Sequence, residues 1–182
     1  PQPKAIFTHA DSLQCRTNNS FAFINLSVSN SPTTSLTYDW RFDDTTSSAS
    51  TSPVKSYTFD GVKTNILYVE NGEGCRDTFS STLEVYPQPI VGFTINDVDQ
   101  CFRGHEFEFT NTSSIKSGTI SFQWDLGDRS NTTSSNVKKV YNQFGDYKVK
   151  LITNSNKGCK DSVSKFVRVY AQPKAYFVTN DS

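Results

Sequence analysis

Apolar and polar residues alternate with a period of two along much of this chain, which is the pattern of half-buried β-strands. Phe122, Trp124 and Leu126 fall on one face of such a strand, and the Gly-Asp pair that follows supplies the turn that ends it. A second alternating segment lies at residues 145–151. No segment combines helical periodicity with a capping signal. The pattern therefore predicts an all-β protein.

The same pattern occurs twice in the sequence. Residues 1–15 align with residues 87–101 at an offset of 86 and share the opening Pro-Gln-Pro. Trp40 aligns with Trp124 at an offset of 84, and the length change falls in a polar run at 27–37, where a surface loop tolerates it. An internal repeat of this size indicates two domains in tandem.

We expect residues 1–86 and 87–170 to form one domain each, because many short strands at even spacing favour a β-sandwich of about seven strands. Residues 171–182 repeat the opening of the chain, so we expect them to start a third repeat or form a C-terminal extension, and the chain to be a segment of a longer array. The aromatic residues predicted for the structural core are Trp40, Trp124, Tyr57 and Tyr141.

The junction between the domains, residues 83–90, is short and contains two prolines, which fix φ and cannot donate hydrogen bonds. We therefore expect a stiff, extended pair and a monomer. Basic and acidic residues balance at 18 each, so no net field draws in nucleic acid or an anionic membrane. No apolar run is long enough to cross a bilayer, and residues 1–20 lack the pattern of a signal peptide.

Four cysteines occur at matching positions, two in each unit. The simplest interpretation is one disulfide within each unit, pairing Cys15 with Cys75 and Cys101 with Cys159. Buried free thiols are the alternative. A zinc site is not expected, because no histidine lies at ligand spacing from two cysteines. Disulfides would imply export from the cytoplasm.

The second unit carries four features that together resemble the PKD (polycystic-kidney-disease-type) repeat. They are Trp124-Asp-Leu-Gly-Asp128, the strand that joins Tyr141, Gly145 and Tyr147, the turn Gly158-Cys-Lys-Asp161, and residues 167–177. The features are most similar to the cysteine-containing version found in tandem in very large surface adhesins of gliding bacteria and in other secreted bacterial proteins.

The first unit departs from this resemblance. Arg41 and Asp43 stand in place of the motif aspartate and glycine, and Lys63 and Asn65 replace a tyrosine and a valine. A different set of residues alternates in this strand, namely Val62, Thr64, Ile66 and Tyr68. The sequence therefore does not decide which face of the strand is buried.

The resemblance implies immunoglobulin-like β-sandwiches at the cell surface or outside the cell, without catalytic residues or cofactors. It implies a rigid extended spacer and interaction module in adhesion or gliding motility. The partners would be a surface polysaccharide, a cell-envelope protein or the neighbouring repeats. An accessory polysaccharide- or protein-binding region of a secreted hydrolase is the alternative.

Two further features invite functional interpretations. Aspartates converge on the turns after the tryptophans and could bind calcium, although aspartate also favours turns for its own backbone hydrogen bonds. These aspartates are Asp39, Asp43, Asp44, Asp125 and Asp128. Neither His9 nor His105 has a matched catalytic partner, and no serine, histidine and aspartate recur together as in a triad. We therefore expect no enzyme activity.

Overall fold

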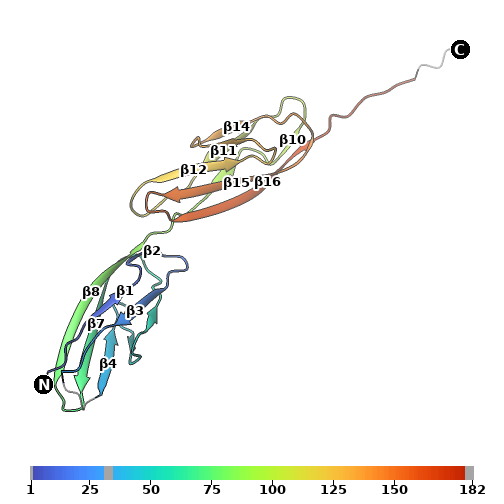
Figure 1. Cartoon of the computed structure of the whole chain (residues 1–182). Coiled ribbons are helices and arrows are strands. Elements are labelled where there is room, and N and C mark those ends of the chain that lie inside the picture. Colours follow the sequence, from blue (N-terminus) through green and yellow to red (C-terminus); the bar gives the residue numbers. More distant parts are fainter. Residues whose placement is uncertain (1, 31–34, 179–182) are drawn as a thin grey trace. The chain divides into compact units, whose positions relative to one another are not determined.

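The computed structural model describes residues 2–30 and 35–178, and every regular element in them is a β-strand (Figure 1). Part of the 27–37 loop and the last four residues of the 171–182 segment lie outside the described residues. The chain divides into two compact units, Pro1–Gln88 and Pro89–Ser182. The predicted fold class, two β-sandwiches in tandem, is confirmed.

The first unit contains eight of the sixteen strands found in the described residues. They are β1 (Phe7–His9), β2 (Leu13–Cys15), β3 (Phe21–Asn25), β4 (Leu36–Arg41), β5 (Ser47–Ser48), β6 (Val54–Lys55), β7 (Gly61–Asn71) and β8 (Arg76–Tyr86). One sheet has the order β1-β3-β6 and the other has the order β2-β8-β7-β4-β5. The two sheets form the two layers of the sandwich (Figure 1).

The second unit repeats this topology strand for strand. Its strands are β9 (Phe93–Ile95), β10 (Asp99–Cys101), β11 (Phe107–Asn111), β12 (Ile120–Asp125), β13 (Asn131–Thr132), β14 (Val137–Lys139), β15 (Gly145–Ser155) and β16 (Lys160–Tyr170). The sheets have the orders β14-β11-β9 and β10-β16-β15-β12-β13. The Ser/Thr-rich stretches after the tryptophans form two-residue edge strands, β5 and β13.

Each core is built around a fully buried tryptophan. The ring of Trp40 lies 4.9 Å from that of Phe7 and 5.4 Å from that of Phe23, measured between centroids. Trp124 lies 5.0 Å from Phe93, the equivalent of Phe7. The indole N–H groups donate to the carbonyl oxygens of residues 50 and 134, both at 2.9 Å. Inward-facing aromatic residues therefore hold the two sheets of each unit together, and each indole N–H has a hydrogen-bond partner.

The register of β7 is the same as that of its counterpart β15. Trp40 lies opposite Leu67, as Trp124 lies opposite Leu151, so Asn65 takes the inward position that Val149 has in the second unit. Val62 points outward and is 62% exposed. The alternation that begins at Val62 therefore belongs to the solvent-facing side of the strand.

The sequence pattern did not predict β2 and β10. Each has three residues and runs parallel to the last strand of its unit, with Cys15 opposite Tyr86 and Cys101 opposite Tyr170. Such short strands lack enough residues to show an alternation. They give eight strands per unit in place of the expected seven or so.

Candidate functional site

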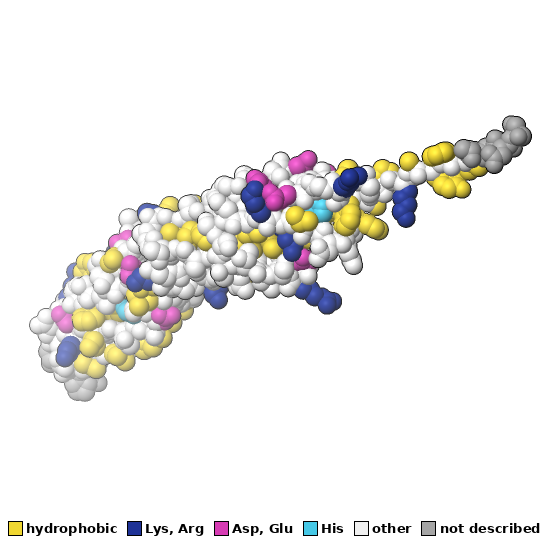
Figure 2. Space-filling model, turned by 90° about the horizontal axis from the view of Figure 1, so that it is seen from above, with side chains coloured by type: hydrophobic (Ala, Val, Ile, Leu, Met, Phe, Trp, Pro, Cys, Tyr) yellow, Lys and Arg dark blue, Asp and Glu magenta, His cyan; other side chains and the backbone are white. Residues whose placement is uncertain are grey.

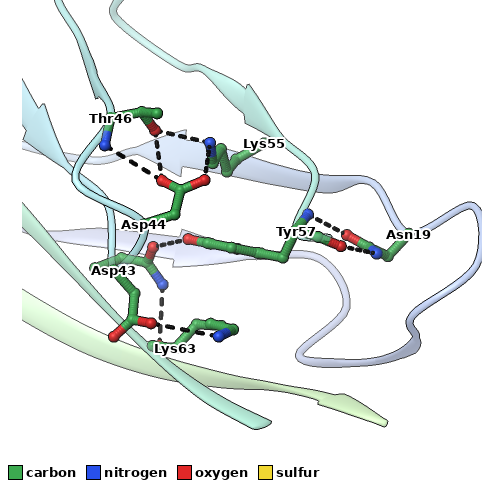
Figure 3. Close-up of polar contacts among 8 residues, drawn as sticks. Asn19, Asp43, Asp44, Thr46, Lys55, Tyr57 and Lys63 are labelled. Carbon is green, nitrogen blue, oxygen red and sulfur yellow. Dashed lines mark hydrogen bonds and ion pairs between the residues drawn. The ribbon is translucent and has the colours of Figure 1, made fainter. Parts of the chain in front are cut away.

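The aspartate that ends the motif after each tryptophan is held by a lysine and a hydroxyl group. Asp44 Oδ2 pairs with Lys55 Nζ at 2.6 Å, and its Oδ1 accepts a 2.6 Å hydrogen bond from the hydroxyl of Thr46 (Figure 3). In the second unit Asp128 Oδ2 pairs with Lys139 Nζ at 2.6 Å, and its Oδ1 accepts from Ser130. Each turn is therefore held by a hydroxyl group of its own and by a lysine from the smaller sheet, on β6 or β14.

These contacts change the acidity of both carboxyl groups. Burial alone would raise the pKa of Asp128, but the hydrogen bonds from Lys139 and Ser130 outweigh it and hold the pKa below its usual value. The same balance between burial and the bonds from Lys55 and Thr46 lowers the pKa of Asp44. Both carboxylates are thus more easily ionised than a free aspartate.

The two lysines were missed from the sequence. Lys55 Nζ lies 5.5 Å from the ring centroid of Tyr57, and Lys139 Nζ lies 5.4 Å from that of Tyr141, so each ammonium group contacts an aromatic ring as well as a carboxylate. A signal was present, because each lysine stands two residues before the tyrosine in a Lys-x-Tyr pattern that recurs at the offset of 84.

The two tyrosines are anchored through their main chains by different residue types. Tyr57 N donates to Asn19 Oδ1 at 2.7 Å (Figure 3). Tyr141 N donates to His105 Nε2 at 2.8 Å. His105 Nδ1 also donates to the carbonyl oxygen of Phe102. His105 is the counterpart of Asn19 at the offset of 86 and fixes the backbone, which accounts for a buried histidine without a catalytic partner.

The tyrosine hydroxyls find different acceptors. Tyr141 donates to the carbonyl oxygen of Leu126 at 2.7 Å, whereas Tyr57 donates to the side-chain oxygen of the buried Asn65. Burial raises the pKa of both phenols well above the ordinary value for tyrosine. Both hydroxyls therefore remain neutral donors at physiological pH.

The remaining aspartates of the predicted calcium sites serve other contacts. Asp39 pairs with Arg41 at 2.7 Å, Asp43 pairs with Lys63 at 3.4 Å, and Asp125 accepts from the main-chain N–H of Gly127 at 3.0 Å. Among residues 2–30 and 35–178, no group of three His, Cys, Asp or Glu side chains is placed to hold a metal ion. The geometry thus gives these aspartates structural tasks.

The predicted disulfides within each unit are wrong. Cys75 and Cys101 are free thiols, whereas Cys15 and Cys159 are disulfide-bonded. The strand lengths explain why. Cys15 ends the strand opposite Tyr86, the last residue of β8, whereas Cys75 precedes Arg76, the first residue of β8.

At about 3.3 Å per residue, the two ends of the 11-residue β8 lie roughly 33 Å apart. A disulfide requires Cα atoms within about 7 Å of each other. Cys101 and Cys159 are separated in the same way by β16. The two cysteines of each unit therefore lie at opposite ends of its sandwich and are too far apart to form a disulfide with each other.

The first unit has a groove on the outer face of its larger sheet. Its volume is about 580 Å³, and Tyr68 lies in its lining with two ion pairs, Arg41 with Asp39 and Arg76 with Glu70. The equivalent place in the second unit is a groove of about 230 Å³ lined by Ile152 in place of the tyrosine. At this place in the sheet, the first unit has an aromatic ring beside the charged groups and the second unit has an isoleucine.

Charges elsewhere are mixed. Figure 2 shows lysine and arginine side chains interspersed with aspartate and glutamate over the face in view, which agrees with the balance of 18 against 18 in the sequence. Within the described part of the chain, no helix is long and apolar enough to span a membrane.

Comparison with solved structures gave similarities at low sequence identity. The PKD1 domain of Vibrio anguillarum Epp is 21% identical over 47% of this chain and 96% of that chain, with a TM-score of 0.41. The PKD1 domain from the Vibrio cholerae metalloprotease PrtV is 24% identical over 47% and 98%, with a TM-score of 0.37. The fibronectin(III)-like modules of Clostridium thermocellum CbhA are 11% identical over 97% and 100%, with a TM-score of 0.41.

Comparison with curated proteins gave no match. A family model described as the PKD domain matches this chain twice, at residues 3–86 and 87–179. The two matches fall on the two compact units and together cover nearly the whole sequence. The chain therefore belongs to the PKD domain family and consists of two PKD domains in tandem.

Proposed function

We propose that this chain is a non-catalytic, extracellular segment of a large bacterial surface adhesin, in which the repeats form a rigid spacer and interaction module for cell-surface adhesion or gliding motility. PKD domains are typically extracellular modules and are generally non-catalytic. The disulfide-bonded cysteines fit an oxidising, extracellular environment.

The path of the chain through the first unit carries this proposal. The chain begins beside the β7–β8 turn, where Gln2 Nε2 donates to the carbonyl oxygen of Arg76 at 3.0 Å and Ala5 N donates to Asp77 at 2.8 Å. It leaves after Tyr86, at the far end of β8. We call these places the turn end and the exit end. A unit whose two chain ends lie at opposite ends of its longest strand adds its full length to an array.

The spacer property can be tested by small-angle X-ray scattering on the whole chain. We expect a maximum dimension close to the sum of two sandwich lengths, because the Pro-bounded junction limits bending. A matched variant with Pro87→Gly and Pro89→Gly should give a broader distribution of distances. A compact profile for the unaltered chain would contradict the spacer proposal.

The adhesin context requires a separate experiment in the producing bacterium. Deletion of both units from the parent protein should lower attachment or gliding speed while the parent protein still reaches the surface. Replacement of the two units by two unrelated sandwich domains of similar length should restore the behaviour if spacing alone matters. Unchanged attachment and gliding after the deletion would contradict the adhesin proposal.

The groove around Tyr68 favours a second candidate, an accessory polysaccharide- or protein-binding region of a secreted hydrolase. Aromatic faces stack against the C–H faces of sugars, and carboxylate and guanidinium groups bond to hydroxyls. Tyr68 is 41% exposed and lies on the open face of the sheet, opposite Asp39. The second unit, with Ile152 at that place, serves as an internal comparison.

Co-sedimentation with insoluble polysaccharides and protein fibres tests this second candidate. Tyr68→Ala should abolish binding if the groove is the binding site, whereas Ile152→Ala at the equivalent position should leave it unchanged. Absence of binding by the folded, unaltered chain would eliminate the groove as a recognition site for these ligands.

A further inference from the structure

We propose that the exit end of the second unit is a binding site for an acidic oligosaccharide, one that carries uronic-acid carboxylates. The site is a groove at two loops, residues 102–106 and 140–144, where two phenylalanine rings stack against the sugar and a lysine meets its carboxylate. The proposal rests on the interaction role in the proposed function and gives that role a place and a ligand class.

The groove has two exposed aromatic rings in its lining. Its volume is about 720 Å³, and it lies where the chain leaves the second unit after Tyr170, beside β10 (Figure 1). Phe102 and Phe144 line it and are 38% and 65% exposed. Elsewhere in this unit the rings of Phe107 and Phe109 are buried in the core. The two rings of the groove are therefore available to contact a ligand.

Hydrogen bonds to the two loops fix the rings in place. The buried His105 donates from Nδ1 to the carbonyl oxygen of Phe102 at 2.8 Å and accepts through Nε2 from the main-chain N–H of Tyr141 at 2.8 Å. The Tyr147 hydroxyl donates to the carbonyl oxygen of Gln143 at 2.8 Å, next to the second ring. Both loops are therefore held in position before a ligand arrives, which lowers the entropy cost of binding.

The polar side chains of the groove match the groups of an acidic sugar. They are the amides of Asn142, Gln143 and Gln172 and the ammonium group of Lys174, which is the one charged residue among the described residues of the lining. An amide both donates and accepts hydrogen bonds, as a sugar hydroxyl does. Lys174 takes part in none of the ion pairs found in the described part of the chain, so its charge is available to a carboxylate. The exposed Arg103, in the first of the two loops, adds a second cation at this end.

The first unit has the same hydrogen-bonded frame but a different lining. Asn19 bridges the equivalent loops, because it donates to the carbonyl oxygen of Arg16 at 2.7 Å and accepts from Tyr57 N at 2.7 Å. Arg16 and Asp60 stand in place of the two phenylalanines, and one ring, that of Phe59, is exposed beside them. The pair of aromatic rings is therefore not needed to build this end of a PKD unit, which points to a binding role in the second unit.

Isothermal titration calorimetry on the whole chain tests the site. The probes are oligogalacturonate and alginate oligosaccharides as acidic sugars, a galacto-oligosaccharide as a neutral sugar, and oligoglutamate as an acidic peptide. We expect binding to at least one acidic sugar, with an affinity that falls as salt is added. Absence of binding to both acidic sugars, or equal affinity for the neutral sugar or the peptide, would overturn the proposal.

This result is separate from the tests of the proposed function. Failure of the calorimetry would remove the sugar site and leave the spacer property to the scattering experiment and the adhesin context to the deletion experiment. Conversely, a compact scattering profile or unchanged attachment after the deletion would contradict the proposed function and leave a measured sugar affinity standing.

Matched variants of the two units locate the binding. Phe102→Arg together with Phe144→Asp installs the residues of the first unit and should abolish binding, whereas Phe59→Ala in the first unit should leave it unchanged. Tyr68→Ala, in the groove on the larger sheet of the first unit, should also leave it unchanged. Lys174→Gln should weaken binding to the acidic sugar roughly two- to fivefold. Retained affinity in the folded double variant would contradict the proposal.

Two single changes separate the lining from the frame. Phe144→Ala removes one exposed ring and keeps the frame, so we expect a folded chain and a loss of affinity of roughly tenfold or more. His105→Ala removes the bridge between the loops and should also weaken binding, whereas His105→Asn supplies the bridging residue of the first unit and should restore most of the affinity. Hydrogen exchange checks that each variant is folded. Unchanged affinity in folded Phe144→Ala would overturn the site, and unchanged affinity in folded His105→Ala would overturn the positioning role of His105.

Discussion

The two PKD units share every strand pairing but differ in the contacts beneath the tyrosine that follows the tryptophan strand. In the second unit the ring of Tyr141 stacks on that of Tyr147 at 3.7 Å between centroids, beside the buried Val149. In the first unit the equivalent places hold Lys63 and Asn65, so polar groups replace an aromatic ring and a valine.

The difference is compensated by new hydrogen bonds. The buried amide of Asn65 accepts from the tyrosine hydroxyl and donates to the main-chain oxygen of Lys63 at 3.2 Å, while the Lys63 ammonium group lies 3.4 Å from Asp43. Both exchanges leave the backbone register unchanged. The comparison shows that the large inward-facing aromatic residues determine the sandwich fold. The residues around the tyrosine can differ between the units, provided that every buried polar group has a hydrogen-bond partner.

The largest expected effect tests whether each unit depends on its own core. Trp124→Ala removes a fully buried indole and should cost the second unit about 3–5 kcal/mol of unfolding free energy. Trp40→Ala should do the same to the first unit. Hydrogen exchange followed by mass spectrometry measures the two units separately in one chain. Equal loss of protection in both units of either variant would show that their stabilities are coupled.

The second largest effect is expected in the turn after the tryptophan strand, where the two units have different residues. Gly127 has φ of +82°, and a Cβ there would lie 2.9 Å from the main-chain nitrogen and oxygen of Lys148. Gly127→Ala should therefore destabilise the second unit by roughly 1–3 kcal/mol. Asp43, at the matching place, has no positive φ, so Asp43→Gly should cost less than about 1 kcal/mol. Similar losses for both changes, read by hydrogen exchange, would contradict this difference between the turns.

Much of the fold followed from the alternation of residues. Phe122, Trp124 and Leu126 were predicted to share one face; Trp124 and Leu126 are buried and Phe122 packs against the same core, because a strand with one wet and one dry face must alternate with period two. Strands with a clear alternation of apolar and polar residues could therefore be predicted from the sequence.

Contacts between residues on different strands and sheets could not be predicted from the sequence. The pairing of Cys15 was predicted from matching sequence positions, but the parallel contact of β2 with β8 puts it a strand length from Cys75. The aspartate turns were read as candidate calcium ligands, whereas Lys55 and Lys139, each 11 residues further along the chain, occupy their carboxylates. The wrong disulfide pairing and the two missed lysines arise because sequence spacing does not specify which side chains meet across two sheets.

A smaller effect tests the rebuilt contacts of the first unit. Asn65→Val restores the residue type of the second unit but leaves the buried hydroxyl of Tyr57 without this acceptor, which should cost about 1–3 kcal/mol. Tyr57→Phe together with Asn65→Val removes both polar groups and should recover part of that loss. Val149→Asn in the second unit is the matched reverse change and should destabilise it. If the double variant of the first unit is no more stable than Asn65→Val alone, the hydroxyl is not the reason for the asparagine.

The smallest expected effect concerns the aspartate–lysine pair that the two units share. The pKa of Asp128 is held below its ordinary value of 3.8, so its contribution to stability is present above about pH 4 and is lost as the pH falls through the lower pKa of the folded state. Asp128→Asn should remove this acid-dependent part. Since the Asp128 and Lys139 side chains keep 26% and 18% of their surface exposed, we expect a loss of only about 0.5–1 kcal/mol at neutral pH.

Asp44→Asn should give a loss of the same size in the first unit, because its contacts with Lys55 and Thr46 are the same. Asp146→Asn, which breaks an exposed pair with Arg168, serves as the control and should have no measurable effect at moderate salt. Urea unfolding at several pH values, monitored by hydrogen exchange in each unit, measures all three variants. A clearly larger loss for Asp44→Asn or for Asp128→Asn would show that the differences around Tyr57 and Tyr141 also affect the motif turn. Equal losses of unfolding free energy for Asp44→Asn and Asp128→Asn would mean that the turn, the lysine and the tyrosine ring form a structural element common to both units. The residues that contact the ring from the neighbouring strand would then vary independently of that element.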